Sequence, residues 1–316
     1  MRQMDGKVKT IRFMLNEDSM ELNELIDGNC YHICTNGQDT PLLMRSEDDF
    51  RTACVYLALL SWKLNVSVLA YIVMSNHVHV LVACRDRMQA EKFTKAYKQK
   101  LSIYLRRKYG MEKTMKGVTD SITLVDSLKY FQNCVAYILR NALCAKVCMK
   151  LEGYQWSSYS AYFADDNLAC YKMIKSLGAR ERKRMLNSRD DLRDCPYCLD
   201  DHGRVVNRSF VRYDIVEAAF KNSCRSFLYF LGTCNDAKME YELTVKPQTR
   251  VGDIEMVKVI EQLVASRFNG KTLADLTLTN KCSIVKAIYF NNKTSIPQLS
   301  RLLGLPRDVV AHVLGC

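Results

Sequence analysis

Two histidines lie two positions apart in the stretch MSNHVHVLV, residues 74–82. The chain has only five histidines, so two of them fall in one apolar run. Side chains on a strand alternate between its two faces, and His77 and His79 are therefore expected to point the same way, with the intervening valine on the other side. Two imidazoles on one rigid strand supply half of a divalent metal site. A pair of histidines satisfied by ordinary hydrogen bonds is the alternative.

A second pair of polar side chains lies in FQNCVAYILRNALCAKV, residues 131–147. Tyr137 and Asn141 are four positions apart, so on a helix they share one face. A phenol next to a metal or base can act as a nucleophile, and an amide can serve as a metal ligand. The alternative is ordinary packing, because the chain has seventeen tyrosines and most tyrosines in proteins pack against other residues.

The spacing of apolar residues predicts the elements that must position these side chains. We expect a strand over 29–35, a helix over 47–65, two paired strands within 66–84, and helices over 88–109 and 125–150. A turn or bulge is expected near 74–76. The apolar stretch 66–84 is broken by polar residues and rich in β-branched ones, which favours strands over a membrane span. No membrane partner is expected.

Composition and charge indicate a globular protein with an anionic partner. The 316 residues are 48% hydrophobic, and 46 Lys and Arg against 34 Asp and Glu leave a net charge of +12. Residues 85–116 hold eleven of the basic residues and three acidic ones, which suits a nucleic-acid backbone, although a solvated helix face has the same pattern. The candidates for DNA contact here are Lys92, Lys95, Lys98, Lys100, Arg106 and Arg107.

The C-terminal residues 246–316 are predicted to form a smaller helical domain. Helical spacing covers 253–268 and 281–290, and TSIPQLSRLLGLPRDVVAHVLG follows at 294–315. A capping Ser or Thr, a turn at Gly304 and Pro306 at the next helix start are typical of a helix-turn-helix, or of an ordinary helical bundle. Arg307 and His312 would then face duplex DNA.

Fourteen cysteines and no apolar leader at the start of the sequence favour reduced thiols and a cytoplasmic protein. Cys195 and Cys198 form a Cys-x-x-Cys pair within the connecting region, residues 166–245. They are either half of a zinc site, with His202 or Cys224 as further ligands, or two free thiols in a connecting region; no second Cys-x-x-Cys follows.

Four separated motifs together resemble a known family. YIVMSNHVHVLV (71–82) resembles the histidine-hydrophobe-histidine (HUH) motif of the single-tyrosine transposases, in particular the REP-associated tyrosine transposases. YHICTNG (31–37), YILRN (137–141) and YQWSSY (154–159) are similar to the family's other landmarks, in the same order. The resemblance covers about residues 29–165. One departure is Ala142, where the family usually has proline directly after the asparagine; proline there would shape the helix rather than do chemistry.

The resemblance implies a fold and an activity. The fold is α+β, a ferredoxin-like antiparallel sheet with helices on one face over 29–165, after an N-terminal extension (1–28) and before the connecting region and the helical domain. The activity is that of a DNA transposase, a single-strand endonuclease and strand transferase acting on hairpin-containing DNA. Tyr137 would form a 5′-phosphotyrosine, His77, His79 and Asn141 would hold Mg²⁺ or Mn²⁺, and two chains would act as a homodimer.

Two other functions compete with this reading. The histidine-triad nucleotide hydrolases also place alternating histidines on a strand, but Ser75 and Leu81 stand at the flanking same-face positions here, so a third alternating histidine is missing. The other alternative is a catalytically silent, sequence-specific DNA-binding regulator that retains the transposase scaffold. The four intact site residues favour the enzyme, whereas the altered sequence after Asn141 leaves room for the regulator.

Overall fold

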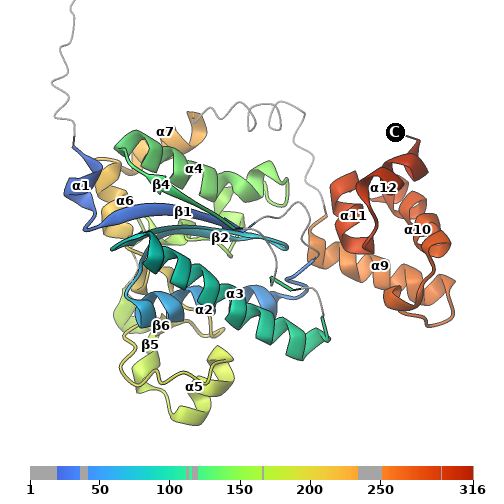
Figure 1. Cartoon of the computed structure of the whole chain (residues 1–316), viewed down its shortest axis with the longest axis horizontal. Coiled ribbons are helices and arrows are strands. Elements are labelled where there is room, and N and C mark those ends of the chain that lie inside the picture. The colour runs from blue at the N-terminus through green and yellow to red at the C-terminus, as the bar shows by residue number, and fades with distance from the viewer. Residues whose placement is uncertain are drawn as a thin grey trace, which may run out of the picture.

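The centre of the molecule is a four-stranded antiparallel sheet with strand order β2-β3-β1-β4 (Figure 1). In this computed structural model the strands are β1 (Asn29–Thr35), β2 (Ser67–Val73), β3 (Val78–Cys84) and β4 (Asp120–Val125). Helix α2 (Glu47–Leu64) connects β1 to β2, and α3 (Arg87–Tyr109) connects β3 to β4. This is the predicted ferredoxin-like arrangement. The structure describes residues 20–35, 42–111, 114–115, 120–165, 167–233, 251–292 and 294–315.

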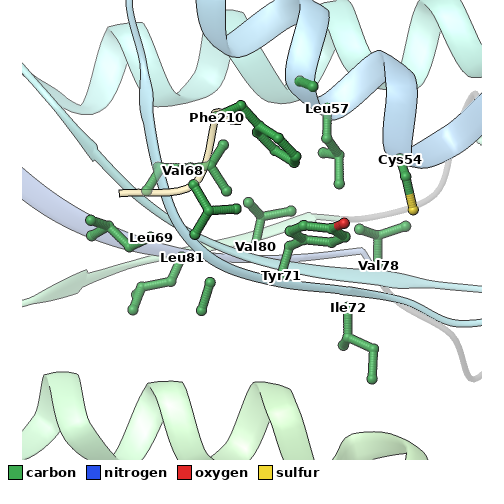
Figure 2. Close-up of a cluster of buried hydrophobic side chains, with 14 of the residues drawn as sticks. Cys54, Leu57, Val68, Leu69, Tyr71, Ile72, Val78, Val80, Leu81 and Phe210 are labelled. Carbon is green, nitrogen blue, oxygen red and sulfur yellow. The ribbon is translucent and has the colours of Figure 1, made fainter. Parts of the chain in front are cut away.

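The two faces of the sheet are covered by different helices. Helices α2 and α3 lie together on one face, as predicted, and α4 (Leu128–Cys144) packs across β2 and β3 on the other (Figure 1). Figure 2 shows how the side chains of β2 and β3 alternate between the two faces of the sheet: Tyr71 and Val80 point toward α2, whereas Ile72 and Leu81 point toward α4. Both faces of β2 and β3 are therefore buried, which explains their continuous apolar sequence.

Local capping sets the ends of the two connecting helices. Ser46 and Asp49 form a capping box at the start of α2, and Asn65 ends that helix in a left-handed conformation with φ of 51°. Helix α3 starts after Asp86, whose carboxylate accepts the backbone N–H of Gln89, and ends at Gly110 with φ of 63°. Each helix begins or ends within one residue of its predicted bounds, because these signals lie in the local sequence.

The region around α4 differs from the prediction. Residues 120–125, for which no strand was predicted, form β4, which pairs with β1 at the edge of the sheet. Four of its six side chains are exposed, so the strand has little of the apolar alternation that reveals strands in a sequence. Helix α4 starts after Ser127 and ends at Cys144 rather than 150, because Lys146 adopts a positive φ of 57° that a helix cannot include.

Residues after the predicted domain boundary at 165 join the same core. The YQWSSY segment lies along the outer edge of β2, where Val73 donates its N–H to Trp156 and Ser158 donates to Tyr71, both at 2.9 Å. Residues 167–233 add a small hairpin and three helices, and Phe210 and Phe227 are buried in the main core. These elements are β5 (Lys172–Met173), α5 (Ala179–Leu186), β6 (Cys198–Leu199), α6 (Tyr213–Ala219) and α7 (Cys224–Thr233).

Parts of several predicted segments lie outside the described residues. These parts are residues 1–19 of the N-terminal extension, residues 36–37 of the YHICTNG motif, residues 112–113 and 116 of the basic segment, residues 166 and 234–245 of the connecting region, and residues 246–250, 293 and 316 of the C-terminal region. The described end of the extension forms the short helix α1 (Leu22–Leu25), with Leu22 in the main core.

The C-terminal helices form a second, smaller core. Helices α9 (Asp253–Arg267), α10 (Leu278–Asn291), α11 (Ile296–Leu303) and α12 (Arg307–Leu314) pack together through buried Ile, Leu, Val and Met side chains. Ser295 caps α11, and Gly304, with φ of 64°, forms the tight turn before α12. The predicted helical character of the C-terminal region is thus confirmed; that it is a separate domain and that α11 and α12 bind DNA stay predictions. Among the described helices, none has the length and apolar character needed to cross a membrane.

The packing of α4 on the sheet predicts the effects of two neighbouring substitutions. Phe131 is fully buried on α4, and the adjacent Tyr130 is 36% exposed. We expect Phe131→Ala to lower the free energy of unfolding by about 3–5 kcal/mol, because it leaves a cavity between helix and sheet. Tyr130→Ala should cost less than about 1 kcal/mol. Urea denaturation would measure both, and equal losses would contradict this orientation of α4.

Candidate active site

The structure brings Tyr137, His77, His79 and Asn141 together on the α4 side of the sheet. His79 lies on β3 and His77 in the turn just before it, with their ring centroids 5.1 Å apart and their planes almost perpendicular. Asn141 Nδ2 lies 3.4 Å from His79 Nε2, and the Asn141 side chain also hydrogen-bonds His77. The Tyr137 ring lies one helical turn away, its centroid 5.2 Å from that of His79.

A third histidine, which was not predicted as a site residue, joins this cluster. His32 on β1 places its Nε2 3.3 Å from His79 Nδ1, and its ring centroid lies 5.9 Å from that of Tyr137. Cys34, two residues along β1, pairs with His79 across the strands and places its Sγ 3.8 Å from His79 Nε2. Three of the chain's five histidines thus meet at one place. Two features of the sequence could have pointed to His32: histidines are scarce in this chain, and His32 lies inside a predicted strand.

Burial keeps the three imidazoles neutral at physiological pH. It lowers the pKa of His32 to about 4 and that of His79 well below its usual value, where His77 and His32 add to the effect. Burial also lowers the pKa of His77 to about 4; the hydrogen bond to Asn141 opposes this shift and the charge of Arg301 adds to it. The Cys34 thiol is likewise neutral, because burial and the nearby Asp120 raise its pKa to about 11. Neutral imidazoles keep a nitrogen lone pair available to a cation.

His77 and His79 each have a hydrogen-bond partner at the same ring atom, Nδ1. His77 Nδ1 lies 2.9 Å from Asn76 Oδ1, and His79 Nδ1 faces His32. If Nδ1 carries the proton in both rings, both Nε2 atoms present lone pairs. Metal-binding histidines usually have this arrangement, in which the ring nitrogen that does not bind the metal donates a hydrogen bond to a partner. A half-turn of the Asn141 amide would present its oxygen instead of its nitrogen. These donors fit a divalent cation.

Within the described residues, no three or more His, Cys, Asp or Glu side chains are arranged to hold a metal ion. The candidate ligands at the active site are two histidines and the amide of Asn141, so they do not form a group of three such side chains. Cys195 and Cys198 are both buried, and the described residues bring no third and fourth ligand of these types to them.

The predicted DNA-binding residues on α3 lie on the opposite face of the sheet from the histidine cluster. Lys92, Lys95, Arg106 and Arg107 are exposed there. Lys98 pairs with Asp120 at 2.8 Å, and Lys100 pairs with Asp190 at 2.6 Å. A strand of DNA that touched both the histidines and α3 would have to pass round an edge of the sheet.

In the C-terminal core, Arg307 and His312 are exposed on α12, the second helix of the predicted helix-turn-helix. Elsewhere, a cavity of about 570 Å³ lies beside the outer edge of β2, between segments 151–164 and 200–207. Its lining includes the YQWSSY aromatic residues but none of Tyr137, His77, His79 and Asn141. The cavity is therefore separate from the candidate active site.

Comparison with known proteins supports the resemblance seen in the motifs. Residues 45–119 match the family described as "Transposase IS200 like", a segment that runs from the start of α2 past the end of α3 and includes both histidines of the HUH motif. The resemblance to single-tyrosine transposases is thereby confirmed over that segment, and it relates this part of the chain to DNA-processing enzymes. No curated protein matches the chain.

One similar solved structure is a REP-associated tyrosine transposase bound to a REP hairpin. The two sequences are 11% identical, and the alignment covers 42% of this chain and 78% of the other, with a TM-score of 0.31. At that TM-score the likeness supports no conclusion about this chain, so the fold and the site stand on the geometry described above.

The lowered pKa values predict how stability depends on pH. Because the folded-state pKa of His32 is about 4 against 6.5 when unfolded, the unfolded chain binds more protons between these values. The stability contributed by neutral His32 is fully present above pH 6.5 and is lost as the pH falls toward 4, by roughly 3 kcal/mol. The free energy of unfolding of His32→Gln should fall less steeply than that of the wild type over this window. Urea melts at several pH values would test this, and parallel slopes would refute it.

Proposed function

We propose that this protein is a metal-dependent DNA transposase of the single-tyrosine type, which cuts single-stranded DNA and rejoins it. The observation that carries the proposal is the convergence of Tyr137 and Asn141 on α4 with His77 and His79 from the β2–β3 region. These pairs are about sixty residues apart in the sequence. Neither pair could do the chemistry without the other, and the fold brings them within hydrogen-bond or ring contact.

The residues divide the chemistry between them. His77, His79 and Asn141 would hold Mg²⁺ or Mn²⁺, with the tautomers of the two histidines set by Asn76 and His32. A bound divalent cation would polarise the scissile phosphate and stabilise the charge that develops on it. Because the imidazole and amide ligands are neutral, they leave the cation its full charge.

Tyr137 would act as the nucleophile. Its hydroxyl oxygen attacks the phosphorus and loses its proton, the bond to the 3′ oxygen breaks, and that oxygen leaves as a 3′-OH after taking up a proton. The product is a 5′-phosphotyrosine, which conserves the energy of the phosphodiester. A 3′-OH from another strand can therefore reverse the step and join new ends without ATP.

The substrate and assembly follow from the same proposal. Single-stranded DNA with hairpins is the substrate class that the motifs imply, with further contacts from the basic face of α3 and duplex contacts from α12. One nucleophile per chain requires two chains to process both ends of an element, so we propose a homodimer. A regulator that uses the same scaffold only to bind DNA is the competing function, which the altered sequence at Ala142 leaves open.

A covalent-adduct assay tests the reaction. Purified protein with Mn²⁺ and labelled single-stranded hairpins from the DNA flanking its own gene should give a protein–DNA adduct on a denaturing gel. Tyr137→Phe should abolish the adduct yet bind the hairpins, because only the nucleophilic oxygen is removed. Tyr130→Phe, an exposed tyrosine two turns earlier on α4, is the matched control and should behave as the wild type.

The outcomes separate the two functions. An adduct that requires Mn²⁺ and Tyr137 supports the transposase. If the folded wild type binds the hairpins but forms no adduct and makes no cut with Mn²⁺ or Mg²⁺, the regulator is the better description.

The basic face of α3 can be tested through the salt dependence of binding. Each lost contact with a single-stranded phosphate lowers the slope of log K against log salt by about 0.7. Lys92→Gln combined with Lys95→Gln should therefore lower the slope by about 1.4 in hairpin-binding titrations. Lys175→Gln with Lys183→Gln, exposed lysines in and before α5, removes the same charge elsewhere and should leave the slope unchanged. Equal slopes in all three proteins would rule out α3 as a DNA contact.

A further inference from the structure

The turn that carries His77 is attached to the C-terminal helical unit, residues 251–315. Ser75, two positions before His77, donates a hydrogen bond from its hydroxyl to the carboxylate of Asp253, the first residue of α9. The Ser75 carbonyl accepts the N–H groups of Leu43 and Met44, both at 2.9 Å. The residue before them, Leu42, is buried in the core of the C-terminal unit. Both the turn and the segment that supports it therefore contact that unit.

Asp253 is the centre of a buried polar network. Its Oδ1 accepts from Gln298 Nε2 at 2.8 Å, and its Oδ2 accepts from Arg301 Nη2 at 2.5 Å and Nε at 3.2 Å, in addition to Ser75. Asp253 is 7% exposed and Gln298 is 4% exposed. A buried carboxylate is stable only when its lone pairs are bonded, so these partners hold Asp253 in one position. Ser75 is thus bonded to a rigid anchor.

The same network lies close to the histidines. Arg301 is near enough to His77 for its guanidinium charge to act on that imidazole. Gln298 and Arg301 both belong to α11, the helix that packs against α12. Asn76 lies between Ser75 and His77, is 6% exposed, and bonds His77 Nδ1. Displacement of Ser75 would therefore also move the residue that orients His77.

We propose that the C-terminal helical unit completes the candidate active site, with Asp253, held by Arg301, positioning the histidine-bearing turn through Ser75. Asp253, Arg301 and Ser75 are positioning residues, since they act through His77. That His77 binds a cation rests on the function proposed above; the positioning of the turn does not. Residues 29–165 would then lack a fully ordered site without the C-terminal helices.

Hydrogen exchange of the full-length protein, without metal or DNA, tests the positioning. Peptides covering residues 70–80 would be followed by mass spectrometry in the wild type and in Ser75→Ala, Ser75→Thr and Asp253→Asn. We expect the amides of residues 74–77 to exchange about 10-fold faster in Ser75→Ala and Asp253→Asn, and at the wild-type rate in Ser75→Thr, which keeps the hydroxyl. Glu255→Gln removes an exposed charge from the same turn of α9 and is the matched control.

A second measurement connects the turn to the site. The dissociation constant for Mn²⁺, followed by electron paramagnetic resonance, should rise about 10-fold in Ser75→Ala and return toward the wild-type value in Ser75→Thr, with hairpin binding unchanged. A contact that only stabilises the fold would change the melting temperature and leave the Mn²⁺ affinity of the folded protein unaltered.

The outcomes keep the two proposals apart. Unchanged exchange at 74–77 in Ser75→Ala overturns the positioning, whether or not the wild type forms an adduct. Faster exchange supports it even if the wild type binds no Mn²⁺ and forms no adduct, a result that would remove the proposed transposase function instead. Should Asp253→Asn unfold the C-terminal helices, Ser75→Ala decides the question, because it leaves the other bonds of Asp253 in place.

Discussion

The pairing register of β3 is the constraint on which the candidate site depends. β3 lies between β2 and β1, and its residues alternate between two buried layers. Val80 packs toward α2 (Figure 2). His79, paired with Cys34 and Ile72, lies on the other face, where its ring contacts Tyr137 of α4. A slip of one residue would place the imidazole in the apolar layer and a valine at the site. The apolar layer therefore enforces the position of the polar one.

Helix α4 positions the other two site residues, Tyr137 and Asn141, and apolar packing fixes this helix as well. It buries Phe131, Val135 and Ile138 against the sheet, and a helix with 3.6 residues per turn then carries Tyr137 and Asn141 on the flank of that apolar stripe. The two polar residues reach the histidines because their apolar neighbours are anchored. The site is thus built on two rigid elements and on the short turn that carries His77, which is held by the contact between Ser75 and Asp253.

Charge is distributed in a way that suits this arrangement. The chain is strongly basic, yet the three clustered histidines are neutral, with His79 buried and His32 and His77 half-buried. The exposed positive residues of α3 lie on the other face of the sheet, whereas the half-buried Lys98 and Lys100 of the same helix are paired with Asp residues. Long-range attraction of a polyanion and local chemistry at a phosphate are therefore properties of different surfaces.

The sequence by itself determined the local features: the ends of α2 and α3, the alternation that places His79, and the helical spacing of Tyr137 and Asn141. Capping and periodicity act over a few residues, so they can be read directly. Only the tertiary structure decided that His32 reaches His79, that 120–125 pair with β1, and that Asp253 holds Ser75. Each of these contacts joins residues at least 47 positions apart in the sequence, and β4 is also an exposed edge strand. Packing of the whole chain, rather than local preference, selects such contacts.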